Sequence, residues 1–446
     1  MSYSSLDPAI LASIITPLSE ANHAFAKIYP GETALRQAVH TVYGGGHLFR
    51  ADSTHKLGLL ARRALETYAP DGIALAQILE EPWEPAFSAK IYQRIQGKLT
   101  REPVEDFRLD YEDGYGNRSD TEEDGHAAQG AQQVAAGLAA GTLPPFIGIR
   151  IKPFNEDLRA RSMRTLAIFI TTLVKETGGI LPPNFVVTLP KVQHPAQATA
   201  AAAILSLLEN ELGLPLGSIP IEPMIETPQA IIDSHGACPL LPIVRAAEGR
   251  CHSLHFGVYD YTASSGITAA YQAMGHPTCD FARAHMIVAL AGTGIHLSDG
   301  ATNILPVAPH RNDNLTEEQL NDNKAVVHAA WRLAYRDNLH SLRNGIYQGW
   351  DLHPAQLIAR YAAVYSFFLG GLDAASGRLK AFVEKAALAS LFGDVFDDAA
   401  TGQGLLNFFL RGIACGAINE QEALETGLTL QEIRTRSFYR ILQGRQ

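Results

Sequence analysis

Short runs of alternating apolar and polar residues recur along the chain, and longer amphipathic or alanine-rich stretches separate them. A period of two is typical of a half-buried strand, whereas a period near 3.6 indicates a helix with one apolar face. The clearest predicted helices cover residues 156–175, 196–212 and 317–342. The predicted strands cover residues 39–43, 107–112, 146–152, 185–191, 219–226, 254–259, 295–299 and 346–352.

The order of these elements predicts the fold class. Strands that alternate with helices form a parallel sheet, because each helix carries the chain back to the start of the next strand. Eight such units favour a closed barrel over an open sheet. We therefore expect an α/β protein, a (β/α)8 TIM barrel with a helical N-terminal leader and a helical C-terminal extension.

Three regions exceed the minimal barrel. Residues 1–38 are predicted to form the helical leader, and residues 39–370 the catalytic barrel. Within the barrel, residues 69–103 form an insertion that contains Pro70, Pro82 and Pro85. Residues 371–446 follow as a helical region that is a possible lid. Because no Gly/Ser-rich or Pro-rich linker separates these parts, we expect additions to one main domain.

Composition and charge narrow the function classes. The 446 residues are 46% hydrophobic and 18% charged, which is typical of a well-buried globular enzyme. A formal charge of −10 argues against a general nucleic-acid binder. No apolar run of membrane-spanning length and no signal peptide is evident, so no membrane association is expected. The four cysteines form no CxxC pair, which favours reduced thiols and a cytoplasmic location.

Ionisable residues fall on the inward face of the predicted strands, near their C-terminal ends. In residues 146–152, for example, the apolar positions alternate with Gly148, Arg150 and Lys152. In this fold the C-terminal strand ends build the active site. The inward set permits two interpretations: a carboxylate metal site beside a basic pocket for an acidic substrate, or a network of internal salt bridges. Its members are Asp110, Glu112, Glu226 and Asp260 on the acidic side and Arg150, Lys152 and Lys191 on the basic side.

Six motifs in order resemble the HpcH/HpaI aldolase–citrate lyase superfamily, and its citrate lyase β-subunit-like and malate-synthase-like branch in particular. They span the greater part of the predicted barrel. The motifs are DYEDGYG at residues 110–116, IRIKP at 149–153, LPKV at 189–192, IEPMIETPQAI at 221–231, HFGVYDYTASSG at 255–266 and GWDLHPAQL at 349–357.

This resemblance implies roles for single residues. Glu226 and Asp260 match the two Mg2+ ligands, and Arg150 matches the arginine that binds the substrate carboxylate and the developing enolate oxygen. Lys191, Glu112 and Asp113 match the shell around them, and Lys152 adds a further cation. One departure is that the first-strand arginine of the family falls on Val39.

The resemblance further implies a homo-oligomer, a trimer or hexamer, whose active site is completed by a C-terminal segment with an acid for proton transfer. GDVFDDAATGQG at residues 393–404 resembles that segment, with Asp397 or Asp398 as the acid. The other interpretation of these two residues is a helix N-cap, which stabilises free amide groups.

The residue types suit enolate chemistry. Mg2+ prefers oxygen ligands and can act as a Lewis acid and a template for a keto acid. The expected reaction is the cleavage or formation of a 3-hydroxy acid, or of its acyl-CoA thioester, with a small carboxylic acid as substrate. Two alternatives remain: a phosphoenolpyruvate-utilising phosphotransferase, and a non-catalytic barrel that binds a small acid.

Overall fold

Eight parallel strands form a closed barrel in the computed structural model, which describes residues 8–31, 33, 35–384, 390–392, 395–397 and 399–445. Each strand pairs with the next along the chain, and the last strand pairs with the first. The predicted TIM barrel is confirmed, and every predicted strand overlaps an observed one. The strands are β1 (His40–Gly45), β2 (Asp106–Asp110), β3 (Phe146–Arg150), β4 (Phe185–Leu189), β5 (Ile221–Ile225), β6 (Ser253–Phe256), β7 (His296–Ala301) and β8 (Gln348–Asp351).

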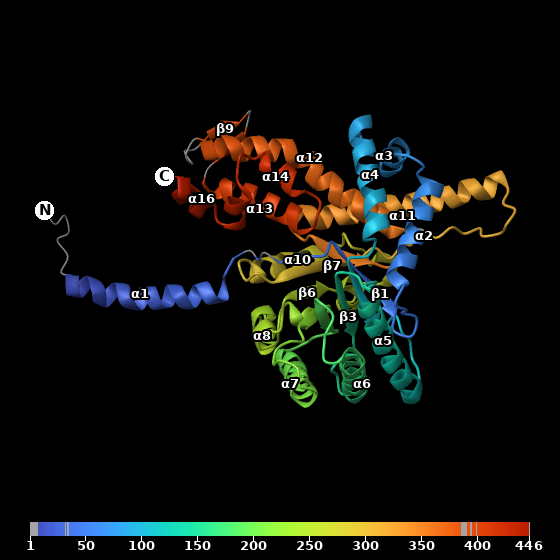
Figure 1. Cartoon of the computed structure of the whole chain (residues 1–446), viewed down its shortest axis with the longest axis horizontal. Helices are drawn as coiled ribbons and strands as arrows, with labels where there is room; N and C mark the ends of the chain where they lie inside the picture. The colour runs from blue at the N-terminus through green and yellow to red at the C-terminus, as the bar shows by residue number, and fades with distance from the viewer. Residues whose placement is uncertain are drawn as a thin grey trace.

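Helices connect the strands and cover the outside of the barrel. In Figure 1, α5, α6 and α7 lie along one side of the barrel, and α11 and α12 lie across the other. The connecting helices are α2 (Ser53–Tyr68), α5 (Asp120–Ala140), α6 (Arg159–Thr177), α7 (Pro195–Leu212), α8 (Leu240–Ala246), α9 (Val258–Ser264), α10 (Pro277–Leu290) and α11 (Glu317–Arg343); α12 (Gln356–Glu384) follows β8.

Local sequence signals fix the ends of these helices. Helix α5 begins with a capping box in which the Ser119 hydroxyl accepts from the backbone N–H of Glu122 and the Glu122 carboxylate accepts from that of Ser119. It ends at Gly141, whose φ of 66° lies in the left-handed region that glycine adopts without strain. The sequence therefore determines where the chain leaves the helix and returns to the sheet.

The predicted alternation of side chains is also present. Ile147 and Ile149 are fully buried beneath the helices, while Arg150 points into the barrel and pairs with Asp110 from β2. Asp110 and Arg150 are register partners on neighbouring strands, so their side chains emerge at the same height. Between the two isoleucines, Gly148 is required, since a Cβ there would lie 2.1 Å from the Val186 carbonyl oxygen.

The insertion folds into two helices, α3 (Gly72–Leu79) and α4 (Pro85–Arg101). Pro85, one of the three prolines of the insertion, is the first residue of α4, where a proline has no helical hydrogen bond to lose. Helix α4 packs against α2 and α12 and so fastens the insertion to the barrel.

The C-terminal region is mostly helical, as predicted. It holds a small hairpin of β9 (Ser390–Phe392) and β10 (Val395–Asp397), and then α13 (Ala399–Ala414), α14 (Glu420–Leu424), α15 (Leu430–Arg434) and α16 (Phe438–Arg445). Helix α12 runs without interruption across residue 370, where the sequence was divided, so the division into domains stays a prediction.

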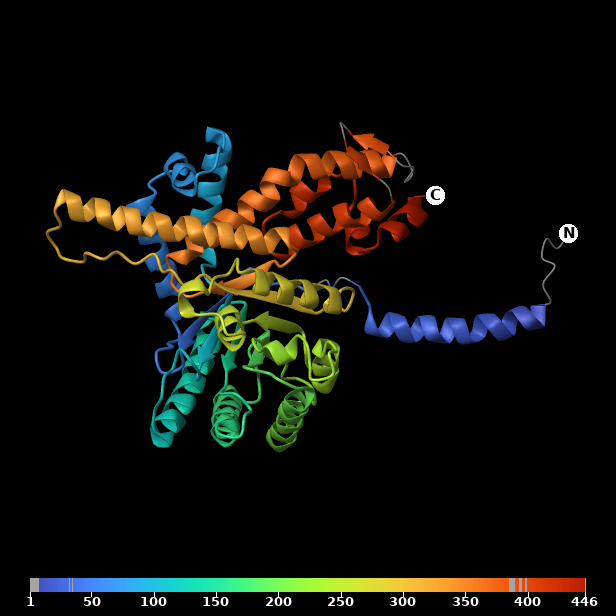
Figure 2. The ribbon, with the colours of Figure 1, turned by 180° about the vertical axis from the view of Figure 1, so that it is seen from behind.

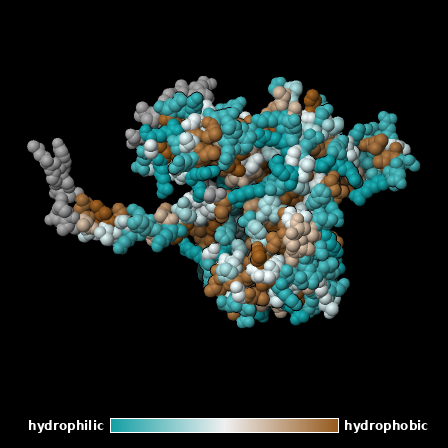
Figure 3. Space-filling view, in the orientation of Figure 1, coloured by the Kyte–Doolittle hydropathy of each residue, from teal (hydrophilic) through white to brown (hydrophobic). Residues whose placement is uncertain are grey.

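The N-terminal helix α1 (Pro8–Ile28) extends away from the body of the molecule (Figures 1 and 2). Its large apolar side chains are exposed, among them Ile10 at 62%, Ile14 at 61% and Phe25 at 62%, and Figure 3 shows apolar residues along it. The chain rejoins the body where the Gly31 N–H donates to the Gly292 carbonyl at 2.8 Å. Among the described helices, none has the length and apolar character to cross a membrane.

Candidate active site

The residues predicted to form the site do gather at the C-terminal mouth of the barrel. Arg150 is the last residue of β3, and Glu226 directly follows β5. Asp260 was expected at the end of the sixth strand, but β6 ends at Phe256 and Asp260 lies in the first turn of α9. Gly257 makes this early turn possible, since a Cβ there would lie 2.2 Å from Glu226 Oε2.

Arg150 is held in place from several directions. Its Nε and one terminal nitrogen donate to the two carboxylate oxygens of Asp110 at 2.7 and 2.6 Å. The guanidinium lies 4.7 Å from the ring centre of Tyr43 and 5.3 Å from that of Trp350. The other terminal nitrogen lies 3.1 Å from Glu112 Oε2. With only 1% of its surface exposed, Arg150 has a fixed plane and turns this last nitrogen toward the acidic residues of the mouth.

Asp110, which was placed on the inward face but given no role, positions this arginine. Its carboxylate accepts the backbone N–H of Glu112 at 3.0 Å and that of Gly114 at 2.7 Å. Burial raises the pKa of Asp110, but Arg150 and the two backbone donors outweigh burial and hold the pKa below its usual value. Asp110 therefore stays ionised and keeps the guanidinium charged and oriented.

Four acidic side chains, which we call the carboxylate cluster, lie around one lysine: Glu112, Asp113, Glu226 and Asp260. Lys191 Nζ donates to Glu112, lies 3.1 Å from Asp113 Oδ2 and lies 3.5 Å from Asp260 Oδ2. The backbone N–H of Lys191 donates to Glu226 Oε1 at 2.6 Å. These contacts bring together five of the residues that the sequence assigned to the metal site and its shell.

The carboxylate cluster holds more negative charge than its partners offset. Burial, followed by the nearby Glu112 and Asp260, raises the pKa of Glu226 to about 8. Burial also raises the pKa of Glu112 and of Asp260, although Arg150 and Lys191 act in the opposite direction. Such crowding of carboxylates favours the arrival of a further cation.

The oxygen donors of the carboxylate cluster fit Mg2+ better than a metal ion that needs three or more side-chain ligands. Within the described part of the chain, no three His, Cys, Asp or Glu side chains are arranged to hold a metal ion by themselves. Mg2+ requires only one or two protein carboxylates, because it keeps several of its waters. Glu226 and Asp260 have the oxygen donors for such binding, and a cation beside them would favour the ionised form of both carboxyl groups.

Two sequence assignments lie elsewhere in the structure. Lys152 Nζ donates to the Tyr111 carbonyl at 2.6 Å and pairs with Glu123 at 2.8 Å, so it faces α5 and not the carboxylate cluster. Val39 precedes β1 at the opposite end of the barrel, and its N–H donates to Glu105. The position matched to the first-strand arginine is therefore not at the mouth.

Asp398 lies outside the described residues, and Asp397 is described only by its backbone in β10. Their assignment as an acid therefore stays a prediction.

Sequence reasoning missed Tyr43, an inward residue of β1. Its ring lies beneath Arg150, and its hydroxyl is hydrogen-bonded to His255 Nδ1 at 3.0 Å. Burial raises the pKa of Tyr43, so the hydroxyl keeps its proton. The signal was present, because Tyr43 lies two residues from Thr41 on the inward face, but an aromatic residue in a strand is usually read as core.

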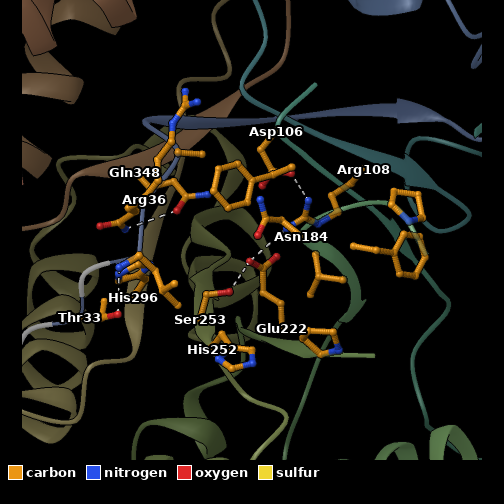
Figure 4. A pocket seen from close by; sticks show the side chains of 18 of the residues that line it. Thr33, Arg36, Asp106, Arg108, Asn184, Glu222, His252, Ser253, His296 and Gln348 are labelled. Carbon is orange, nitrogen blue, oxygen red and sulfur yellow. Dashed lines mark hydrogen bonds and ion pairs between the residues drawn. The ribbon is translucent and has the colours of Figure 1, made fainter. Parts of the chain in front are cut away.

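A cavity of about 470 Å3 opens at the other end of the barrel, and Figure 4 shows its polar wall. Arg108 pairs there with Asp106 and lies 3.4 Å from Glu222, which also accepts from Ser253 at 2.7 Å. These buried charges are matched to one another. Since active sites of this fold lie at the C-terminal strand ends, we interpret this wall as a structural salt-bridge network.

Comparison with known proteins agrees with this fold. The family described as "Domain of unknown function (DUF6986)" matches residues 18–441. The chain belongs to this family. No curated protein matches the sequence. A citrate lyase from Burkholderia xenovorans LB400 has a similar structure, with a TM-score of 0.55 at 18% identity, over 89% of this chain and 100% of that one.

Two further solved structures are similar to this chain, with lower TM-scores. CitE from Mycobacterium tuberculosis, in complex with magnesium, acetoacetate and coenzyme A, has a TM-score of 0.48 at 15% identity, over 86% of this chain and 100% of that one. A Haloferax volcanii malate synthase in complex with magnesium and glyoxylate has a TM-score of 0.43 at 16% identity, over 91% and 98%. The predicted resemblance to the citrate lyase superfamily is confirmed at the level of the fold.

Proposed function

We propose that this DUF6986 protein is a Mg2+-dependent carbon–carbon lyase that cleaves or forms a 3-hydroxy acid or its acyl-CoA thioester. The observation that carries the proposal is the carboxylate cluster, in which Glu226 is buried with a pKa raised to about 8 beside the ordered guanidinium of Arg150. Glu226 and Asp260 would hold the metal, and bound Mg2+ would supply Lewis-acid activation of a keto acid.

In this proposal Arg150 binds the acid through the terminal nitrogen that Asp110 leaves free. That nitrogen now faces Glu112, so an incoming carboxylate would replace Glu112 as its partner. Because Asp110 already fixes the guanidinium plane, binding needs no reorganisation of the arginine, and its charge is in place as negative charge develops on the substrate oxygen. Tyr43 and Trp350 cover the guanidinium and exclude water from it.

Proton transfer would fall to Asp397 or Asp398. The competing interpretation of these two residues is a helix N-cap. Replacing each aspartate by alanine separates the two roles. A proton-transfer residue would lower kcat with little change in stability, whereas loss of a cap would lower stability by about 1 kcal/mol and leave kcat unchanged.

The proposal is tested by turnover of purified protein with Mg2+ and a panel of keto acids, each with and without acetyl-CoA. We expect carbon–carbon bond formation or cleavage that stops on chelation of the metal. Glu226→Gln should lose Mg2+ affinity by at least about tenfold in calorimetry while the protein stays folded. Unchanged Mg2+ affinity in this variant would remove Glu226 from the metal site. Transfer of phosphate from phosphoenolpyruvate, or binding of an acid without turnover, would support the two alternatives instead.

We also propose that the protein assembles as a homo-oligomer, a trimer or hexamer. Support comes from α1, whose exposed Ile10, Ile14 and Phe25 are unusual for a helix of a monomer. An isolated helix is marginally stable in water and gains stability by packing its apolar face. Light scattering on the full chain, and on a variant with Ile10 and Ile14 changed to Ser, should show a larger particle for the full chain.

A further inference from the structure

Lys191 is the residue that brings the carboxylate cluster together. Its ammonium contacts Glu112, Asp113 and Asp260, and its backbone N–H donates to Glu226. One residue thus reaches all four carboxylates, through its side chain for three of them and through its main chain for the fourth. No other cation of the described mouth has such a position, since Arg150 is bound to Asp110 and Lys152 to Glu123.

The main chain of Lys191 is held in an unusual conformation. Its φ of 52° lies in the left-handed region, which a lysine adopts at a cost in free energy. This conformation points the N–H at Glu226 Oε1, over 2.6 Å, and leads the side chain toward the other three carboxylates. The two directions fix the start of the side chain, whereas its four methylene groups leave the ammonium free to change partners.

The ammonium is reachable from solvent, and so are two of its three partners, Asp113 and Asp260. The Lys191 side chain is 27% exposed, and its outermost partner, Asp113, is 59% exposed. Glu112, by contrast, is buried at 9%. The nearby carboxylates outweigh burial and raise the pKa of Lys191, so the side chain carries a full positive charge.

We propose that Lys191 is a resident counter-cation: its ammonium neutralises the carboxylate cluster when no metal is bound, and it competes with Mg2+ for the same carboxylates. This inference rests on the proposed function in one respect, namely that Mg2+ binds at Glu226 and Asp260. When the metal binds, the ammonium withdraws from Asp260 and Glu112 and keeps the exposed Asp113 as its partner. The lysine therefore sets the metal affinity below the value that the carboxylates alone would give.

The test is the Mg2+ affinity of Lys191→Met, measured by calorimetry on the full chain with no substrate present. Methionine keeps an unbranched side chain of similar length and the same backbone restriction, and it removes the charge together with the hydrogen-bond donors of the ammonium. We expect Mg2+ to bind at least about tenfold more tightly, because a competing charge within a few ångströms is gone. In a chelator the variant should melt at a lower temperature than the unchanged protein, and Mg2+ should raise its melting temperature by more.

Two controls accompany this variant. Lys191→Arg keeps the charge and should bind Mg2+ no more tightly than the unchanged protein. Lys56→Met removes a lysine from an exposed ion pair with Asp52 and should leave the affinity unchanged. If Lys191→Met does not fold, Lys191→Gln, which keeps a polar end group, takes its place with the same expected direction.

The outcomes separate this inference from the proposed function. Equal or weaker Mg2+ binding by the charge-free variants, with binding by the unchanged protein intact, overturns the counter-cation role and leaves the proposed function standing. Tighter binding by these variants without turnover of any keto acid by the unchanged protein supports the counter-cation role and contradicts the proposed lyase. Absence of Mg2+ binding in every variant overturns both.

Discussion

Two buried glutamates, Glu222 in β5 and Glu226 directly after it, have opposite electrostatic surroundings. Glu222, at the N-terminal end, faces Arg108 and accepts from Thr188 at 3.0 Å and from Ser253 at 2.7 Å. Burial raises its pKa, but Arg108, His255 and Ser253 outweigh burial and hold the pKa well below its usual value. Glu226, at the mouth, accepts one backbone N–H and has its pKa raised to about 8.

The two glutamates are equally buried, at 1% exposure each, so burial alone does not decide the sign of the shift. The charge and the hydrogen-bond donors around each carboxyl group decide the sign of its pKa shift. A carboxylate with a matched cation and donors stabilises the fold, whereas one that is crowded by other carboxylates needs something from outside the chain.

Removal of Arg108, the cation that faces Glu222 and Asp106, should have the largest effect on stability. Arg108→Met leaves Asp106 and Glu222 buried without their counter-charge, which should lower the free energy of unfolding by about 3–5 kcal/mol. Urea denaturation followed by circular dichroism measures this change. Arg159→Met, in an exposed pair with Glu156, is the control and should be nearly neutral. A small effect of Arg108→Met would show that the stability of this end of the barrel does not depend on the ion pairs of Arg108.

At the mouth, Arg150→Lys should reduce kcat/KM by about 100-fold, or about 2.7 kcal/mol, because lysine cannot keep both bonds to Asp110 and also present a donor to substrate. Steady-state kinetics with the substrate found in the keto-acid panel measures the loss. The unfolding free energy of the same variant shows whether the fold is affected. If kcat/KM stays within about threefold, Arg150 does not have the assigned role.

The raised pKa of Glu226 predicts a pH dependence with a definite sign. Its folded pKa lies above the unfolded value, so its contribution to stability is fully present below about pH 4.5 and is lost as the pH rises toward 8. In chelator at about pH 8, Glu226→Gln should therefore be more stable than the unchanged protein by about 1–3 kcal/mol. Thermal unfolding from about pH 5 to 8 checks this, and a constant difference between the two proteins across that range would contradict it.

The smallest effect is expected for Ser253→Ala. The Ser253 hydroxyl donates to Glu222 Oε2 at 2.7 Å, but Arg108 and Thr188 remain as partners of the carboxylate. We expect a loss of about 1 kcal/mol in the free energy of unfolding. A loss close to that of Arg108→Met would mean that the hydroxyl, and not the cation, secures Glu222.

The sequence predicted the barrel because alternation and helical periodicity are local signals, and all eight strands confirm it. The sequence was less informative where the conformation of one segment depends on its contact with a segment far away in the chain. Asp260 lies on α9 and not on a strand, because the close approach of Gly257 to Glu226 turns the chain early. Likewise the pairing of Arg150 with Asp110 depends on the strand register, which no single segment encodes.

The sequence predicted a strand that begins at Val39, and the observed β1 begins one residue later, so Val39 lies at the end of the barrel opposite the mouth. Lys152 shows a further limit. It sits one alternation step beyond Arg150, but past the end of β3, where the rule for strand side chains no longer applies, and its ammonium turns to Glu123.

Helix α12 couples the C-terminal helices mechanically to the barrel. Its 29 residues form a continuous rod on the order of 40 Å long that starts beside β8 and ends among the C-terminal helices. Tyr361 and Phe368 are fully buried along it, so the rod cannot slide or rotate without disrupting the core. Force applied to the C-terminal helices would therefore be transmitted to the barrel wall through α12. A closing motion of the C-terminal region over the mouth would therefore have to bend this helix.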